Sequence, residues 1–341
     1  MGINHDQVTS WMVANVAAVA PLEFELIAGG RSNLTYRVTD AAGKQFALRR
    51  PPTSHVLPTA HDMVREHTII SALAPLGVPV ATPLGLCVDE AVNERPFYVM
   101  EFVEGAILRD RRQAEEAFSL ADRHQIGANL AQTLAQLHDV DVVSAGLGEL
   151  ARHDGYIERQ IRRWRGQYEQ MAVEGVNHGG LVEAVGDQLA ANIPTQQKVA
   201  VVHGDYRLDN TVLNPQGQVR AILDWEICTL GDPLADLGLL LVYWAEPSDG
   251  TAALLGAAPT TADGFMTRKE VLAAYEKHTS LDVSHVSFYQ AFGYWKLACI
   301  LQGVFARYSA GATAGDTGSV AEFPKHIALL AETAKRTLEE A

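Results

Sequence analysis

The chain has 341 residues, 48% of them hydrophobic, which is enough for two compact lobes with substantial cores and argues against disorder. Its formal net charge of −14 disfavours nucleic acid and anionic membranes as partners. No apolar run approaches the roughly 20 residues of a membrane span, no signal-type segment opens the chain, and the three cysteines lack metal or redox spacing, so we expect a protein of the reducing cytoplasm.

The first predicted element is a β-hairpin around the sequence GGRSN. Apolar and polar residues alternate on both sides of this turn, in FELIAGGRSNLTYRV, as they do in two antiparallel strands. Gly29 and Gly30 permit close approach of the backbone to a ligand, and Ser32 and Asn33 can donate hydrogen bonds to phosphate. A turn without a ligand is the alternative, but the position before a further strand favours a phosphate-binding tip.

A strand and a helix follow this hairpin. The strand reads KQFALRRPP, and Arg49 within it offers a permanent charge and forked donors for an anionic group, a solvated strand end being the alternative. Residues 61–73 show helical spacing of apolar side chains and are followed by Pro75. Glu66 lies in the middle of this predicted helix.

Residues 95–105, RPFYVMEFVEG, read as an apolar strand that ends at Gly105, and helical patterns dominate beyond it. The segment 120–141 carries a core-forming stripe at helical spacing, formed by Ile126, Leu130, Leu134 and Leu137. The segment 153–171 gathers four arginines around Trp164, which suits either an anionic ligand or a solvated amphipathic face. The last predicted helices span residues 267–278, 284–307 and 320–338.

The strongest functional signal lies between Val199 and Asp224. This stretch reads VAVVHGDYRLDNTVLNPQGQVRAILD, which combines a short apolar strand, the spacing H-x-D-x-x-x-x-N, a strand-turn-strand unit and a further Asp. It places Asp205, Asn210 and Asp224 on two turns bounded by apolar strands. Each of these residues alone is more often a turn former or a helix cap, but the composite pattern is typical of a phosphoryl-transfer site.

The chemistry of phosphoryl transfer requires these residue types. A carboxylate such as Asp205 can orient an acceptor hydroxyl and take its proton. Mg²⁺ prefers oxygen ligands and keeps several waters, so the amide oxygen of Asn210, the carboxylate of Asp224 and the phosphates of a nucleotide make a sufficient site. The segment therefore predicts a base and two magnesium ligands.

The motifs HGDYRLDN, ILDWE and GDPLADLG resemble those of the aminoglycoside phosphotransferase and choline kinase superfamily, which is related to the protein kinases. From about residue 25 to the C-terminus, the chain looks most like the phosphotransferases related to the kinase-like domain of acyl-CoA dehydrogenase fusion proteins. The resemblance implies that Asp205 is the catalytic base, that Asn210 and Asp224 bind Mg²⁺, and that ATP or GTP is the co-substrate. It also implies that His203 braces the catalytic loop.

The same resemblance extends to the predicted nucleotide site. Arg49, in FALR, takes the place of the Lys of the kinase sequence V-A-I-K. Glu66 would pair with Arg49 as a Glu does on the kinase αC helix, an ordinary exposed Glu being the alternative. Adenine would bond to the backbone at Glu101 and Val103, where a hinge at residues 101–105 joins the lobes. Further along, the resemblance assigns Asp232 and Asp236 to bracing the catalytic segment.

We therefore expect an α+β, protein-kinase-like fold with a small antiparallel-sheet lobe in residues 1–104 and a large, mainly helical lobe in residues 105–341. The predicted reaction moves the γ-phosphoryl group of ATP or GTP to a hydroxyl of a small molecule. The overall resemblance and the arginine-rich segment favour a hydroxyacyl-CoA, with an aminoglycoside or another antibiotic as the alternative. A nucleotide-binding regulatory module and a metal-dependent phosphatase are rival functions, and the sequence leaves the oligomeric state open.

Overall fold

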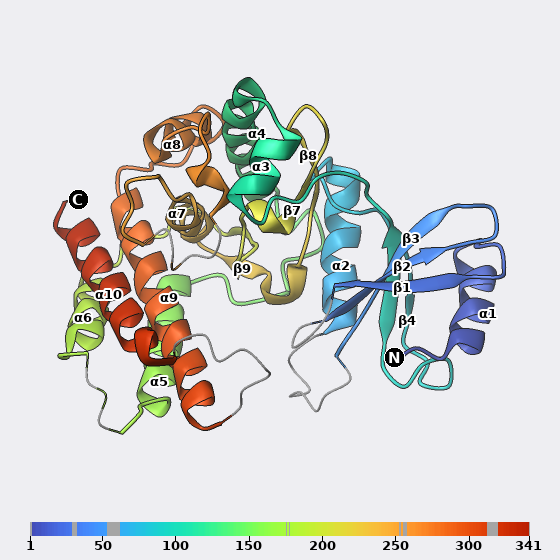
Figure 1. Cartoon of the computed structure of the whole chain (residues 1–341), viewed down its shortest axis with the longest axis horizontal. Helices are drawn as coiled ribbons and strands as arrows, with labels where there is room; N and C mark the ends of the chain where they lie inside the picture. The colour runs from blue at the N-terminus through green and yellow to red at the C-terminus, as the bar shows by residue number, and fades with distance from the viewer. Residues whose placement is uncertain are drawn as a thin grey trace.

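The computed structural model describes residues 2–28, 33–52, 62–174, 176, 178–251, 254, 258–311 and 320–340. Figure 1 shows a β-sheet flanked by two helices at one end of the molecule and a larger, mainly helical body at the other. This is the α+β layout expected from the sequence.

The small lobe is built on five strands in the order β1-β2-β3-β5-β4, each antiparallel to its neighbour. The strands are β1 (Glu23–Ala28), β2 (Leu34–Thr39), β3 (Gln45–Arg50), β4 (Pro83–Cys87) and β5 (Phe97–Glu101). The predicted hairpin of β1 and β2 is confirmed. Gly29, Gly30 and Ser32, at its tip, lie outside the described residues.

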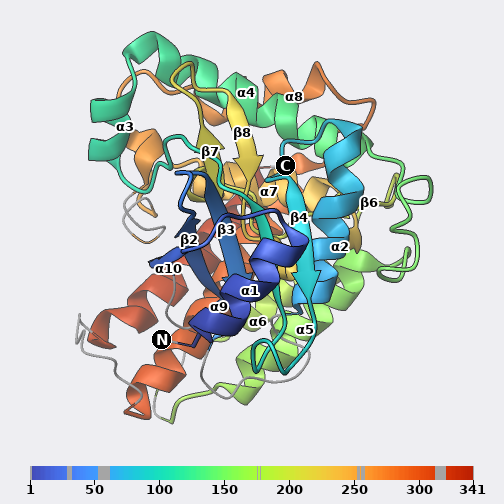
Figure 2. The same cartoon turned by 90° about the vertical axis from the view of Figure 1, so that its right-hand side faces the viewer.

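Side-chain alternation in β3 decides which residues face each flanking helix. Phe46 and Leu48 belong to the core beneath α1 (His5–Asn15), whereas Ala47 belongs to the core beneath α2 (Met63–Leu73). Because successive residues of a strand point to opposite faces, Arg49 shares the α2 face with Ala47. Figure 2 shows α1 in front of the strands, where the sequence analysis predicted no helix.

The last strand of the sheet is shorter than the sequence suggested. We expected it to end at Gly105, but β5 ends at Glu101, where its pairing with β3 also ends, at Phe46. The chain then crosses to the other lobe, where Ala106 and Leu213 exchange two backbone hydrogen bonds of 2.8 Å.

The large lobe is a group of packed helices. They are α3 (Arg111–Ala117), α4 (Leu120–Asp139), α5 (Tyr156–Gln170), α6 (Leu181–Ala191), α7 (Leu234–Tyr243), α8 (Arg268–Glu276), α9 (Val286–Ser309) and α10 (Phe323–Glu339). The predicted stripe of α4 is fully buried, and α9 packs along both α7 and α10. No helix in the described part of the chain is both long and apolar enough to cross a membrane.

Two small antiparallel sheets lie in the large lobe near its junction with the small one (Figure 1). The first pairs β6 (Ala200–Val202) with β9 (Thr229–Gly231), and the second pairs β7 (Thr211–Leu213) with β8 (Val219–Ile222). The loops that leave these strands carry the residues of the HGDYRLDN and ILDWE motifs. The predicted strand-turn-strand unit between Asn210 and Asp224 is therefore confirmed as the β7–β8 hairpin.

Candidate active site

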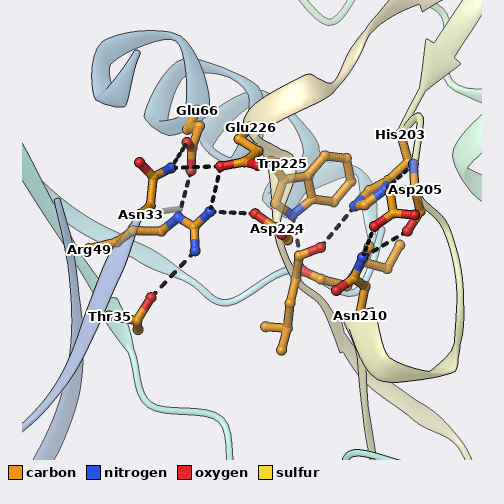
Figure 3. A network of polar contacts seen from close by, with 12 residues as sticks. Asn33, Thr35, Arg49, Glu66, His203, Asp205, Asn210, Asp224, Trp225 and Glu226 are labelled. Atoms are coloured by element: carbon orange, nitrogen blue, oxygen red, sulfur yellow. Dashed lines mark hydrogen bonds and ion pairs between the residues drawn. The ribbon is translucent and has the colours of Figure 1, made fainter. Parts of the chain in front are cut away.

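Arg49 contacts both lobes at this junction. The Nε atom of Arg49 donates to Glu66 Oε2 at 2.9 Å, and its Nη2 atom donates to Asp224 Oδ1 (Figure 3). Glu66 is 1% exposed, so the expected ion pair with Arg49 is confirmed and the alternative of an exposed helix Glu is excluded. The bond to Asp224 was not predicted.

The carboxylate of Glu66 receives further donors that the sequence analysis did not identify. Tyr98 donates its hydroxyl to Glu66 Oε2 at 3.0 Å, and Asn33 donates its amide to Oε1 at 2.7 Å. The Asn33 amide also donates to Glu226 Oε2 at 3.3 Å, which links β2 to the turn after β8. Burial raises the pKa of Glu66, and the adjacent Arg49 counteracts that shift.

The charge of Arg49 is stabilised by its surroundings. Burial lowers the pKa of its guanidinium, but the nearby carboxylates outweigh this effect and raise the pKa above its ordinary value. Glu66 contributes most, and Asp224 and Glu226 add to it. A permanently charged, forked donor therefore lies at the junction of the two lobes.

Asp224 follows β8 in a conformation that costs backbone free energy. Its φ and ψ angles are 63° and 63°, in the left-handed region that few residues other than glycine adopt. The next residue, Trp225, anchors this turn because its indole N–H donates to Ile222 O at 3.0 Å and its ring packs edge-on against His203 at 4.9 Å. Such strain persists where the surrounding structure enforces it, and it is concentrated at functional sites.

The catalytic-loop residues Asp205 and Asn210 are bonded to each other. The Asn210 Nδ2 atom donates to both the backbone oxygen and Oδ2 of Asp205, at 2.9 Å each. Since the amide nitrogen is used in this way, the amide oxygen of Asn210 is the free end of the group. Asp224 lies close by, because its neighbour Leu223 donates its N–H to the Asn210 carbonyl at 2.8 Å.

His203 has the bracing role that the resemblance implied. Its Nδ1 atom accepts a bond from the Asp205 N–H at 3.3 Å, so its Nε2 atom carries the proton and donates to Leu223 O at 2.8 Å. The imidazole therefore ties the loop of Asp205 to the turn of Asp224. Both ring nitrogens are used within the protein.

Asp236 braces the catalytic segment, as expected, whereas Asp232 contacts α9 instead. Asp236 Oδ2 and Oδ1 accept bonds from the N–H groups of His203 and Gly204, at 2.6 and 2.8 Å. Burial alone would raise the pKa of Asp236, but hydrogen bonds from His138 and the backbone lower it below its ordinary value. Asp232 accepts the Tyr289 hydroxyl at 2.7 Å, and its burial raises its pKa.

A pocket of about 270 Å³ opens beside Asp205. Two of its lining residues contact this Asp: Arg207, whose Nε atom lies 3.4 Å from Asp205 Oδ2, and Tyr243, which makes a side-chain hydrogen bond to it. The Arg207 guanidinium also stacks on the Tyr243 ring at 4.6 Å. Its other lining residues include Arg109, Asp209, Trp244 and Thr260. The sequence analysis did not select Arg207 as a site residue, although its position within the HGDYRLDN motif could have indicated it.

The residues predicted to bind adenine and the arginine-rich helix lie outside this polar network. Glu101 and Val103 stand at the end of β5, and the Glu101 N–H donates to Thr82 O at 2.9 Å. In the arginine-rich helix α5, Arg162 and Arg165 pair with carboxylates at 2.7 and 2.6 Å. These pairs favour the alternative of a solvated amphipathic face for much of that helix.

Comparison with known proteins identifies the chain at the level of its family. A model of the phosphotransferase enzyme family matches residues 23–268. Mouse (Mus musculus) acyl-CoA dehydrogenase family member 10 is 34% identical over 318 residues, which are 91% of this chain and 29% of that protein. The chain thus spans less than a third of the length of this relative.

Solved structures share the fold. A candidate aminoglycoside phosphotransferase from Ralstonia eutropha JMP134 is 32% identical with a TM-score of 0.80, and the match covers 98% of both chains. The amicoumacin kinase hAmiN, determined in complex with AMP-PNP, Ca²⁺ and Ami, has a TM-score of 0.60 over 95% of this chain and 93% of its own; at 18% identity this likeness concerns the fold alone.

The fold and the junction between the lobes define a protein-kinase-like phosphotransferase, as expected from the sequence. The chain belongs to the phosphotransferase enzyme family.

Proposed function

We propose that the protein transfers the γ-phosphoryl group of ATP or GTP to a hydroxyl of a small metabolite, in the space between its two lobes. The observation that carries this proposal is the arrangement in Figure 3, where Arg49 of the sheet contacts Asp224 and Asn210 holds Asp205. Leu223, next to Asp224, donates its N–H to the Asn210 carbonyl. A phosphate-binding charge, two oxygen ligands and a carboxylate base are thereby brought to one place.

The nucleotide is assigned to the small lobe, residues 1–104, with a hinge at residues 101–105. Because the Glu101 N–H is already bonded to Thr82 O, adenine would use the Glu101 carbonyl and the Val103 backbone. The loop with Gly30 and Ser32 would cover the phosphates. Asn33 would join it only by exchanging its present bonds to the two glutamates.

The donor set at the junction fits a hard divalent cation. The amide oxygen of Asn210 is its free end, and the contact of Asp224 with Arg49 uses only Oδ1 of that carboxylate. Mg²⁺ would be held by these two residues and by the phosphates of the nucleotide, because it prefers a few carboxylate or amide oxygens and retains water. When bound, it neutralises negative charge on the phosphate oxygens.

Asp205 is the residue we assign as the base. Its carboxylate is a quarter exposed, so an acceptor hydroxyl can reach it, while Asn210 and Arg207 hold its Oδ2 atom. A carboxylate in this position orients the hydroxyl and accepts its proton, an effect of about 10²–10⁴-fold in rate. The other residues of the loop fix its direction.

We further propose that the acceptor is a hydroxyacyl-CoA or a similar anionic metabolite. The pocket beside Asp205 is lined by Arg109, Arg207 and Asp209; Arg207 is paired with Asp209 at 2.8 Å, which leaves Arg109 as the cation that would bind an anionic group of the acceptor. The relation to acyl-CoA dehydrogenase family member 10 supports an acyl-CoA context, although the chain spans only 29% of that protein.

The test is a transfer assay with Mg²⁺, ATP or GTP, and 3-hydroxybutyryl-CoA or kanamycin as acceptors, read by mass spectrometry of the phosphorylated product. Asp205→Ala and Asp224→Ala should each lower kcat at least about 100-fold, and Asp187→Ala, an exposed control, should not. Full transfer by both site variants would show that the assigned roles are wrong. Nucleotide binding without turnover on any acceptor would favour the regulatory module, and phosphoester hydrolysis without nucleotide would favour the phosphatase.

A further inference from the structure

A lysine from a distant helix contacts the loop that carries Asp205. Lys296 lies on α9, 92 residues along the chain from Gly204, and its Nζ atom donates to the Gly204 carbonyl at 3.1 Å. No sequence motif connects the two segments. The packing of α9 against α7 brings this lysine to the catalytic loop.

The contact completes a clamp on the peptide that leads into Asp205. The Gly204 N–H donates to Asp236 Oδ1 at 2.8 Å, so an acidic side chain from α7 holds one end of Gly204 and the basic side chain of Lys296 holds the other. Gly204 has φ +86°, and a Cβ atom there would lie 3.1 Å from the Ile227 side chain. The backbone conformation of this turn therefore favours glycine, and two charged side chains hold the turn in place.

Retaining an ammonium group at this position costs free energy. Part of the Lys296 side chain is exposed, but its surroundings are dense enough that burial lowers its pKa. Asp205 and Asp236 oppose this shift, and Arg163 of α5 adds to it. None of the ion pairs among the described residues includes Lys296, and its Nζ atom also lies over the Trp164 ring, at 5.7 Å.

We propose that Lys296 is a positioning residue for phosphoryl transfer. By fixing the orientation of the Gly204 carbonyl, it holds the backbone of Asp205 so that its N–H meets His203 and its carboxylate meets Asn210. The inference rests on the proposed role of Asp205 as the base. It also connects the base to α9, a helix of the large lobe that none of the predicted site residues belongs to.

A positioning role and a purely structural role predict different effects of replacing Lys296. If Lys296 only supported the fold, its replacement by an apolar residue would lower stability and activity together. If it is kept for positioning, its removal relieves the burial of a charge, so stability stays equal or rises while activity falls. The two properties should then separate.

The experiment compares Lys296→Met, Lys296→Gln and Lys296→Arg with Lys335→Met, a control on the surface of α10. Each variant is measured for Tm, for the Kd of Mg²⁺ and AMP-PNP, and for kcat and KM with ATP and 3-hydroxybutyryl-CoA. We expect Lys296→Met to lower kcat about 10-fold to 100-fold with nucleotide Kd and Tm unchanged or Tm raised. Lys296→Arg should recover most of kcat, and Lys335→Met should match the native protein.

A second readout needs no acceptor. The Asp205 amide, which donates to His203, should exchange its hydrogen at least about 10-fold faster in Lys296→Met and in Lys296→Gln than in the control. Unchanged exchange, or a loss of kcat that only follows a loss of Tm, would overturn the inference. If Asp205→Ala keeps full activity, the proposed function fails instead, and amide exchange still decides whether Lys296 holds the loop.

Discussion

Arg49 of the small lobe donates a hydrogen bond to Asp224 of the large lobe, while its Nε atom remains paired with Glu66. The residue expected to bind nucleotide phosphates thus contacts a predicted metal ligand before any ligand is bound. A second contact runs beside it, since Arg65 donates to the Cys228 carbonyl at 2.7 Å. Binding of a metal-nucleotide complex would have to share or replace the bond between Arg49 and Asp224.

The first prediction concerns Arg49. In Arg49→Met, nucleotide Kd should rise at least about 10-fold, because the phosphates lose a charged, forked donor. The free energy of unfolding should fall by about 2–4 kcal/mol, since Glu66 remains buried without its ion pair. Isothermal titration with AMP-PNP and urea unfolding measure the two effects. Arg37→Met, which removes a more exposed pair with Glu25, is the control, and equal nucleotide binding by both variants would contradict the assignment.

The second prediction separates the metal ligand from its neighbour. Asp224→Asn should raise the Mg²⁺ concentration for half-maximal activity at least about 10-fold, because a carboxylate ligand becomes a neutral amide. Glu226→Gln is a matched control: Glu226 also faces Arg49, at 3.8 Å, but is not a predicted ligand. Activity measured against Mg²⁺ concentration distinguishes them. The same Mg²⁺ dependence in both variants would remove Asp224 from the metal site.

The parts that the sequence predicted well are those set by local pattern. The segment from Val199 to Asp224 holds its predicted site residues on adjacent strands and turns, so their spacing in the sequence determines how close they lie in the structure. The helix at residues 61–73 and the stripe of α4 follow from periodicity in the same way. The pair of Arg49 and Glu66 was found through resemblance, since the two lie on different elements.

Contacts between segments that are distant in the sequence could not be predicted from local spacing or periodicity. The bonds of Arg49 to Asp224 and of Lys296 to Gly204 depend on how whole elements pack. Asp224 and Gly204 lie in recognisable motifs, but those motifs do not indicate which distant residue contacts them. The sequence analysis did not predict α1, a helix of 11 residues in which Val8, Trp11 and Met12 stand at helical spacing. Tyr243 reaches Asp205 only because α7 ends beside the catalytic loop.

The third prediction concerns two buried aspartates whose pKa values shift in opposite directions on folding. The folded-state pKa of Asp236 is lowered, so its carboxylate contributes stability above its ordinary pKa, and that contribution is lost as the pH falls below about 4. The folded-state pKa of Asp232 is raised, so its ionisation costs stability as the pH rises above about 4. Asp232 lies just before α7, and Asp236 lies in the first turn of that helix.

Asp236→Asn should therefore lose about 2–4 kcal/mol at pH 7 and less at pH 3, whereas Asp232→Asn should change stability by less than about 1 kcal/mol at pH 7. Relative to the native protein, Asp232→Asn should become less stable as the pH falls. Urea unfolding at several pH values between 3 and 7 tests the signs. Parallel curves for the two variants would show that the bonds to His203 and Gly204 do not hold Asp236 ionised.

The fourth prediction concerns the contact between α7 and α9, which carry Asp236 and Lys296 to the catalytic loop. A Cβ atom at Gly238 would lie 2.4 Å from the backbone carbon of Tyr289, and a backbone cannot move aside as a side-chain end can. Gly238→Ala should therefore destabilise the protein by about 3 kcal/mol or more and should lower kcat, since α7 must shift away from α9.

Gly166→Ala in α5 is the matched helical control, because no atom lies within 4 Å of the added Cβ. This substitution should stabilise the protein by about 0.5–1 kcal/mol through helix propensity alone. Urea unfolding and transfer assays on both variants measure the difference. If Gly238→Ala behaves like Gly166→Ala, then α7 and α9 do not pack closely enough to fix the positions of Asp236 and Lys296 around Gly204.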